Sequence, residues 1–322
     1  MKRIVVVIAI LFGCAPAVPA QDCTQTVPFN VVDEKTGVAV VSLRPEMFQA
    51  RLGEMAIPIA SVQAVEKRRI LLLVDESGSM ERTNKLGSHQ KEALQVTEDA
   101  LTQMLAQLPG GLSVSYGVFN DKAAFADGFF TDPKQLQQAI AETRQKLPKL
   151  GRGGTALFDA LLQAAARFDT PQVGDAILLL SDGGENRSKA TEGKFEKEFR
   201  RSGLRLALLW VNQHENEYVE PLIPTVTNLA RATGGAVGTI DINDASWITA
   251  KDSAANRLAL RKFWTEEVLS GYALKVQVPA SFSKPKKWKV QLNGVADREL
   301  KHVALQYPEK LAPCPVSTAA VH

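Results

Sequence analysis

Carboxylate and hydroxyl side chains directly follow a short apolar run early in the chain. The run is Ile70–Val74, and Asp75, Ser77 and Ser79 come after it. An unbroken apolar run of this length is typical of a strand buried on both faces. A carboxylate followed by two hydroxyls at alternating positions is typical of a loop folded around a hard cation. The stretch therefore predicts a strand that leads into a metal site.

Two later loops carry the same kinds of side chain. Gly151–Thr155 leads into a predicted helix, and Ser181–Gly184 follows the apolar run Ala176–Leu180. Each loop alone is more often an ordinary turn or helix cap. Three such loops in order, each at a strand end or a helix start, favour one common site. The oxygen ligands predicted for it are Asp75, Ser77, Ser79, Thr155 and Asp182.

The chemistry of this ligand set decides which ion it suits. An all-oxygen set fits Mg²⁺ first, with Mn²⁺ or Ca²⁺ as alternatives, and does not fit Zn²⁺ or copper. An ion with only two carboxylates beside it stays electrophilic. We therefore expect it to accept a further anionic oxygen from a glutamate or aspartate on a partner protein.

The segments that must position these loops alternate between strands and helices. Apolar strand candidates lie at 70–74, 112–119, 176–180, 204–211 and 236–240. Between them, apolar residues recur with a period near 3.6: Leu94, Leu101, Leu105 and Leu108; Leu136 and Ile140; Leu157, Leu161, Ala165 and Phe168; Leu222, Val226 and Leu229; and Leu260, Phe263, Trp264 and Val268. This alternation predicts an α/β fold.

The predicted fold is a Rossmann-like, mostly parallel six-stranded sheet with helices on both faces. Residues 122–127 follow a predicted turn at Asn120 and Asp121 and are expected to form the antiparallel edge strand of the sheet. In such open sheets, ligands gather at the carboxyl ends of the strands, near the point where strand order reverses. The three polar loops lie at such ends.

The two ends of the chain are predicted to pair into a small β-module. Residues 29–33, 37–41 and 57–65 are rich in β-branched or alternating residues, and residues 272–278 and 287–292 alternate as well. This pairing would bring Cys23 and Cys314 within bonding reach, so a disulfide is one hypothesis and two unrelated thiols are the other.

Residues 1–20 have the pattern of a secretory signal peptide, with a basic start, an apolar run and a small-residue end. The expected location is therefore exported, either periplasmic or secreted. Leu11–Cys14 resembles a lipoprotein processing box, which leaves lipid anchoring at Cys14 as an alternative. No later stretch reaches the length of a transmembrane segment. The formal charge of +3 gives no indication of nucleic-acid binding.

The three polar loops closely resemble the motifs of von Willebrand factor type A domains. The matching segments are Asp75–Ser79, Gly153–Ala160 and Leu179–Gly183. The resemblance implies a Rossmann-like sheet and a metal-ion-dependent adhesion site, with the three hydroxyl residues near the ion and the two aspartates often bound through water. The whole chain is also similar to a bacterial exported subgroup of these proteins. The family resemblance also suggests that the last core helix, at 255–270, shifts when a ligand binds.

The resulting division is a signal peptide at 1–20, an N-terminal β segment at 21–68, the type A domain at 69–271, and a C-terminal β segment and tail at 272–322. We expect a non-enzymatic, exported binding module that captures a carboxylate of a partner protein through the ion. Arg152, Glu185, Asn186 and His214 are expected to line the rim of the site. The alternative is a metal-dependent hydrolase acting on phosphate or ester substrates, for which no general base is evident.

Lysines near the C-terminal end are the other candidate binding feature. Lys284, Lys286, Lys287 and Lys289 surround Trp288. Alternation places Lys287 and Lys289 outside and Trp288 inside, which is typical of a solvated strand.

Overall fold

The computed structural model describes residues 22–33, 40, 42–81, 92–106, 108–146, 154–213, 223–242, 253–280, 282–294, 296, 300 and 302–314. The predicted signal peptide, Cys14 and the start of the second polar loop lie outside these residues. Among the described residues, no helix is both long and apolar enough to cross a membrane.

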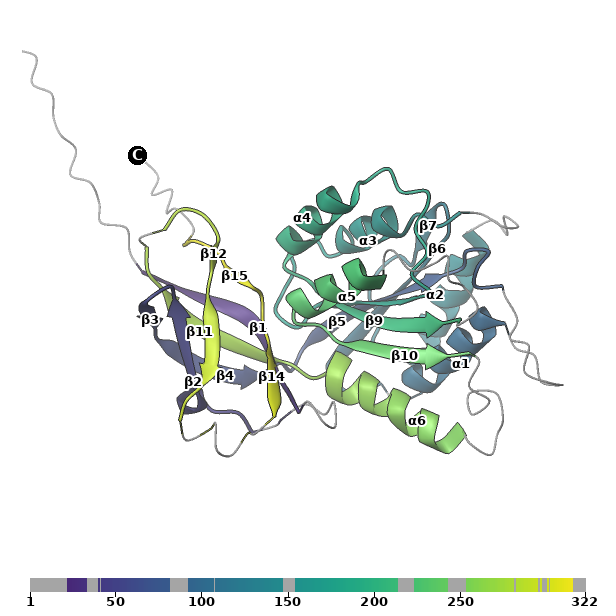
Figure 1. Ribbon diagram of the computed structural model, residues 1–322. Coiled ribbons are helices and arrows are strands. Elements are labelled where there is room, and N and C mark those ends of the chain that lie inside the picture. The colour runs from purple at the N-terminus through teal and green to yellow at the C-terminus, as the bar shows by residue number, and fades with distance from the viewer. Residues whose placement is uncertain are drawn as a thin grey trace, which may run out of the picture.

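The described elements fall into a six-stranded α/β unit and a separate β-module (Figure 1). The α/β strands are β5 (Arg68–Asp75), β6 (Leu112–Phe119), β7 (Ala123–Phe125), β8 (Ala176–Ser181), β9 (Arg205–Asn212) and β10 (Val237–Asp241). Its helices are α1 (Ala93–Leu105), α2 (Pro133–Lys146), α3 (Leu157–Ala165), α4 (Glu192–Ser202), α5 (Ile223–Ala232) and α6 (Ser253–Lys262), followed by the π-helical segment η3 (Phe263–Val268).

The predicted sheet is confirmed. Its strand order is β10-β9-β8-β5-β6-β7, in which all neighbours are parallel except the antiparallel edge pair β6–β7. All five predicted apolar strands are present, and residues 122–127 contain the short edge strand β7. The apolar runs of β5 and β8 form the centre of the sheet.

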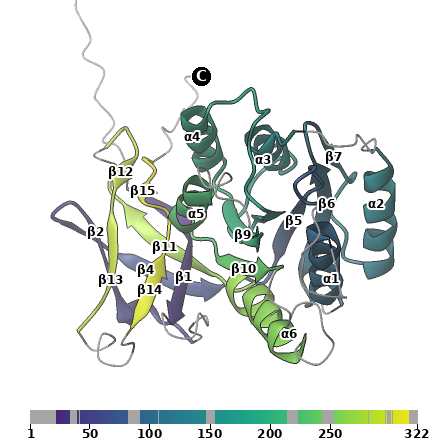
Figure 2. The same ribbon diagram turned by 45° about the vertical axis from the view of Figure 1, so that its right-hand side comes forward.

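Helices cover both faces of this sheet, as its sequence pattern requires. Leu72 and Val74 of β5 face a core formed with α1, α2 and α6. Leu71 and Leu73 face the other core, formed with α3, α4 and α5. Figure 2 shows the two helical layers on either side of the strands. Because both faces are covered, β5 must be apolar at every position, and this gives the unbroken run seen in the sequence.

Two helices differ from their sequence-based expectation. The sequence pattern gave no helix at α4, whose buried residues are only Phe195 and Phe199, one turn apart. The last core helix was expected to be continuous over 255–270, but its second half widens into the π-helical η3. The buried residues of η3 are Phe263, Trp264 and Val268, whose spacings of one and four residues also occur on an α-helical face, so the apolar pattern did not reveal the widening.

The β-module joins the two ends of the chain, which confirms their predicted pairing. Its strands are β1 (Cys23–Asp33), β2 (Phe48–Leu52), β3 (Met55–Ile57), β4 (Ile59–Ala64), β11 (Tyr272–Val278), β12 (Lys286–Lys287), β13 (Lys289–Leu292), β14 (Val303–Gln306) and β15 (Lys310–Leu311). The N-terminal β1 pairs antiparallel with both β11 and β14. The sequence missed β2, and the single strand expected at 57–65 is two strands that belong to different sheets. The break falls at Pro58, which has no N–H for a ladder hydrogen bond. Of the strand expected at 37–41, only residue 40 is described, and it lies outside any strand.

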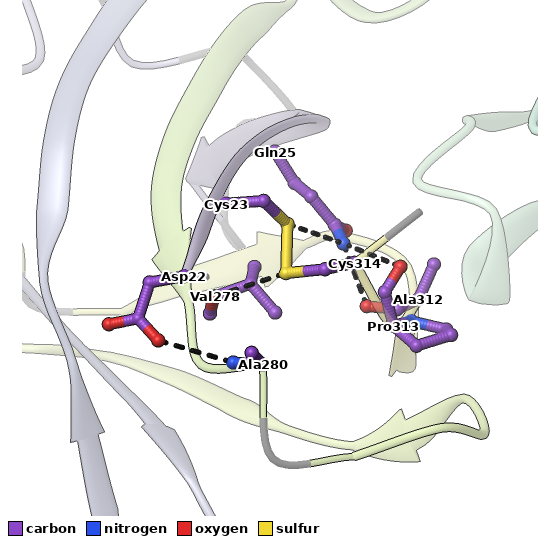
Figure 3. Close-up of a disulfide and its surroundings, with 8 residues drawn as sticks. All are labelled: Asp22, Cys23, Gln25, Val278, Ala280, Ala312, Pro313 and Cys314. Atoms are coloured by element: carbon purple, nitrogen blue, oxygen red, sulfur yellow. Dashed lines mark hydrogen bonds between the residues drawn. A yellow bond between two sulfur atoms is a disulfide. The ribbon is translucent and has the colours of Figure 1, made fainter. Parts of the chain in front are cut away.

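A disulfide between Cys23 and Cys314 closes the β-module (Figure 3). It links the start of β1 to the segment that follows β15, across 291 positions of sequence. The side-chain amide of Gln25 donates to the carbonyl of Ala312 over 2.8 Å and supports the same junction. Of the two hypotheses for these cysteines, the disulfide is confirmed.

Candidate functional site

The three polar loops meet where the strand order reverses. From β5 the chain passes first to β6 on one side and later to β8 on the other, so β5 and β8 lie side by side although they are far apart in sequence. Asp75 ends β5, and Asp182 directly follows β8. This is the position at which open α/β sheets bind ligands.

Asp75 is held by hydrogen bonds from its own loop and from β8. Its side chain is completely buried, and its Oδ1 accepts a hydrogen bond from the Ser77 backbone N–H at 2.9 Å. Its Oδ2 accepts one from the Ser181 hydroxyl at 2.6 Å. The Oγ atoms of Ser77 and Ser79 are 3.0 Å apart, so the first loop gathers a carboxylate and two hydroxyls at one place.

Thr155 and Asp182 approach this place from the other two loops. A Cβ added to Gly184 would lie 3.4 Å from both the Thr155 Oγ1 and the Asp182 Oδ1, so these two oxygens border the same small space. The side-chain carbonyl of Asn186 accepts from the Thr155 backbone N–H at 2.9 Å. The Thr155 carbonyl accepts from the backbone N–H of Asn186, also at 2.9 Å. These bonds fix the second loop onto the third.

Gln213 ties the first loop to the third, and the sequence analysis missed it. Its side-chain amide nitrogen donates to the Ser79 carbonyl and to the Asp182 Oδ2, both at 3.1 Å. Gln213 comes directly after β9, the neighbour of β8. The signal in the sequence was a polar residue at the end of a predicted strand. Gln213 lies near the site only because β9 is next to β8, and this strand order could not be read from the sequence.

Glu185 and Asn186, two of the four residues expected at the rim of the site, instead form hydrogen bonds within the chain. Glu185 uses both carboxylate oxygens inside the chain. Its Oε2 accepts from the Phe158 backbone N–H at the start of α3 at 3.0 Å, and its Oε1 accepts from the Ser188 N–H at 2.8 Å. It therefore caps α3, while Asn186 holds Thr155. Arg152 and His214 lie outside the described residues.

Negative charge at the site is not balanced by any described side chain. Neither Asp75 nor Asp182 forms an ion pair with a lysine or arginine among the described residues. Burial, and then repulsion from Asp182, raise the pKa of Asp75 to about 7, against the opposing hydrogen bonds from Ser181 and Ser77. A bound cation would relieve both effects.

The residues present fit a hard divalent cation. They offer two carboxylates and three hydroxyl oxygens, with neither nitrogen nor sulfur donors, which suits Mg²⁺, Mn²⁺ or Ca²⁺. Within the described ranges, no group of three or more His, Cys, Asp or Glu residues is placed to hold a metal. A cation bound between Asp75 and Asp182 would need further ligands, and the hydroxyls of Ser77, Ser79 and Thr155 are the neutral oxygens that could supply them.

Comparison with known proteins identifies the unit that carries this site. Residues 70–185 match the family model of the von Willebrand factor type A domain. The chain contains a von Willebrand factor type A domain. The matched segment begins in β5 and ends after β8, so it includes all five predicted ligands. A type A domain indicates a protein-interaction module.

Several solved structures are similar to this chain. The conserved hypothetical protein BatB from Bacteroides thetaiotaomicron is 18% identical, with a TM-score of 0.43, over 61% of this chain and 98% of BatB. A von Willebrand factor type A protein from Catenulispora acidiphila is 16% identical, with a TM-score of 0.44, over 86% of this chain and 70% of that protein. A D319A mutant of the PilB minor pilin from Streptococcus sanguinis is 11% identical, with a TM-score of 0.43, over 62% of this chain and 63% of the pilin. No curated protein sequence matches the chain.

Proposed function

We propose that this protein is an exported binding module that captures a carboxylate of a partner protein through a divalent cation, with Mg²⁺ the first choice. Asp75 and Asp182 supply the negative charge that holds the ion, and Ser77, Ser79 and Thr155 supply neutral oxygens. When bound, the ion supplies an electrophilic centre for an oxygen of the partner. The type A domain spans 69–271 in this proposal, between the β segments at 21–68 and 272–322.

The observation that supports this function is the unbalanced pair of carboxylates beside three hydroxyls. Neutral hydroxyl ligands leave more of the ion's charge for an incoming carboxylate than further aspartates would. Gln213 likewise preserves the charge of the ion, because its neutral amide forms a hydrogen bond with Asp182 and adds no negative charge. The chain's own residues thus position the ligands and leave the last anionic ligand to a partner.

The disulfide supports the exported location. Stable disulfides form in oxidising compartments and are rare in the cytosol, so a bond between Cys23 and Cys314 indicates a protein that acts outside the cytoplasm. Residues 1–20 would direct this export as a signal peptide.

The hydrolase alternative finds less support. A hydrolase that activates water at the ion needs a general base or a second metal, and the described residues offer no second cluster of metal-ligating side chains. Turnover of a phosphate or ester substrate that is lost in Asp182→Asn would favour the hydrolase instead.

The proposed function can be tested by measuring Mn²⁺ binding, with the relaxation rate of water protons as the readout. Bound Mn²⁺ should enhance relaxation in the wild type and in Asp121→Asn, a control that removes an exposed carboxylate, and should not do so in Asp182→Asn. A peptide containing glutamate should then displace water from the ion and lower the enhancement, whereas its glutamine counterpart should not. Equal effects of the two peptides would refute carboxylate capture even if the ion binds.

A further inference from the structure

Arg187 lies at the rim of the predicted metal site, although the sequence analysis did not select it. It belongs to the loop after β8, which also carries Asp182. A Cβ added to Gly154 would collide with the Arg187 Cγ and would lie 2.6 Å from the Arg187 Nε, so the stem of Arg187 packs directly on Gly154. Gly154 immediately precedes the predicted ligand Thr155. Standard bond lengths therefore place the Arg187 Nε within about 10 Å of the Thr155 Oγ1.

Hydrogen bonds and packing hold the base of Arg187 in place. Its backbone N–H donates to the Thr155 carbonyl at 3.0 Å and to the Glu185 Oε1 at 2.9 Å. Because Gly154 has no side chain, the stem of Arg187 can lie against the loop that contains Thr155. The loops that form the metal site thus also fix the point at which the Arg187 side chain leaves the backbone. A residue that is fixed in advance loses less conformational entropy when a partner binds.

The charged end of Arg187 is exposed and has no counterion in the part of the chain that the structure describes. Carboxylates of neighbouring residues already accept hydrogen bonds from backbone N–H groups. Glu185 accepts from the Phe158 N–H, and Asp159 accepts from the Ala190 N–H, both at 3.0 Å. A guanidinium has five N–H donors in a planar fork that matches the two oxygens of a carboxylate. Arg187 can therefore bind an external carboxylate without breaking an ion pair within the described chain.

The depth of the site separates Arg187 from the predicted metal ligands. Asp75, Thr155 and Asp182 are buried, with at most 5% of each residue exposed, whereas Arg187 is exposed. A carboxylate that reaches the ion must enter below the surface, while the Arg187 guanidinium stays at the surface. The natural counterion for Arg187 is therefore a second carboxylate, on the part of the partner that remains outside.

We propose that Arg187 determines which partners the site accepts, by selecting acidic peptide segments that carry two carboxylates. One carboxylate binds the ion, and the second forms a bidentate pair with the Arg187 guanidinium. This inference rests on the proposed capture of a carboxylate through the ion, and it adds the class of partner. A segment with a single acidic residue binds through the ion alone, and a basic residue at the second position is repelled by Arg187.

Peptide titration of the Mn²⁺-loaded protein tests the proposal, with the chain from Gln21 onward and the relaxation rate of water protons as the readout. One peptide contains a single glutamate. The others carry a second glutamate after one, two or three glycines, and each has a counterpart with glutamine at the second position. In the wild type, at least one spacing should bind about fivefold more tightly than its glutamine counterpart, which is the upper range for an exposed ion pair. Added salt should reduce this gain.

Arg187→Gln should abolish the gain from the second glutamate. It should not weaken the binding of Mn²⁺ or of the single-glutamate peptide, because the proposal assigns Arg187 to the second carboxylate only. Arg187→Lys keeps the charge but loses the planar fork, so it should retain only part of the gain. An unchanged unfolding temperature would establish that both variants keep their fold.

Two lysines provide matched controls for charge. Lys189 is an exposed cation in the same loop, and Lys287 is an exposed cation of the β-module. Lys287 and Lys289 are exposed and Trp288 is buried, so the alternation predicted around Trp288 is confirmed. Figure 1 shows the β-module at the end of the sheet opposite the carboxyl ends of β9 and β10. Lys189→Gln and Lys287→Gln should both retain the gain.

The outcomes of this experiment separate the role of Arg187 from the proposed function. If the wild type binds no Mn²⁺, or the single-glutamate peptide displaces no water from the ion, carboxylate capture fails and the role of Arg187 fails with it. If both hold, the role of Arg187 alone is overturned by any of three results. These are that no spacing distinguishes glutamate from glutamine, that the gain survives in Arg187→Gln, or that Lys189→Gln loses the gain equally.

Discussion

Asp75→Asn should stabilise the metal-free protein at high pH. Asn keeps the shape of Asp75 and can still pair with the Ser77 N–H and the Ser181 hydroxyl, but it carries no charge. In the wild type, burial and then the nearby Asp182 raise the pKa of Asp75 from 3.8 to about 7. The folded state therefore binds the proton more tightly than the unfolded state, and its stability falls as pH rises between these two values.

The size of this effect follows from the shift. About three pKa units at about 1.4 kcal/mol each give about 4 kcal/mol across the whole window. Between pH 5 and pH 8 about two of these units are crossed, or about 3 kcal/mol. This is a large part of the 5–15 kcal/mol that usually stabilises a folded domain, so the change should be readily measured.

Urea unfolding in the presence of a chelator provides the assay, with wild type and Asp75→Asn compared at pH 5 and pH 8. The variant should be the more stable by about 1.5 kcal/mol at pH 5 and by about 4 kcal/mol at pH 8, because about one pKa unit of the shift has been crossed at the lower pH and all of it at the higher. Mg²⁺ should then stabilise the wild type and not the variant. Asp121→Asn, which removes an exposed carboxylate, should follow the wild type. A difference between wild type and variant that is the same at both pH values would refute the reasoning.

Three further perturbations test other parts of the structure. Burial, and then repulsion from Glu266, raise the pKa of Glu267 from 4.5 to about 7, so the stability of the wild type should fall as pH rises between these values. Glu267→Gln should remove this loss of stability, which urea unfolding at several pH values would measure. Paired Cys23→Ser and Cys314→Ser substitutions should cost about 2–5 kcal/mol and lower the unfolding temperature, whereas an unchanged temperature would deny the disulfide a stabilising role. Gly235→Ala should cost about 1–3 kcal/mol, because its Cβ would collide with the backbone carbonyl oxygen of Leu206 in β9. Gly193→Ala, in an open position on α4, should not destabilise the protein.

The centre of the fold could be predicted because its sequence pattern allows few alternatives. Ile70–Val74 and Ala176–Leu180 are apolar at every position, which a strand can be only when helices cover both of its faces. The two polar loops that follow these strands then had to lie at their carboxyl ends, and the third leads into α3. The structure brings the predicted residues together there, while their role as metal ligands stays a proposal.

Other features depend on contacts that local pattern does not show. Gln213 reaches the site only because β9 lies next to β8, and strand order was not available from sequence. The helix α4 is anchored by just Phe195 and Phe199, too few apolar positions for a period to be recognised. In the β-module, short strands from both ends of the chain form separate sheets, so their register is set by distant partners.

Calorimetric titration of Mg²⁺ is the most direct test of the metal site. The account predicts saturable binding at one site in the wild type. It also predicts loss of that binding in Ser77→Ala, which removes one hydroxyl and leaves the backbone N–H that donates to Asp75 in place. Circular dichroism would establish that the variant keeps its fold. No binding by the folded wild type, or equal binding by the variant, would contradict the assignment of these residues as the metal site.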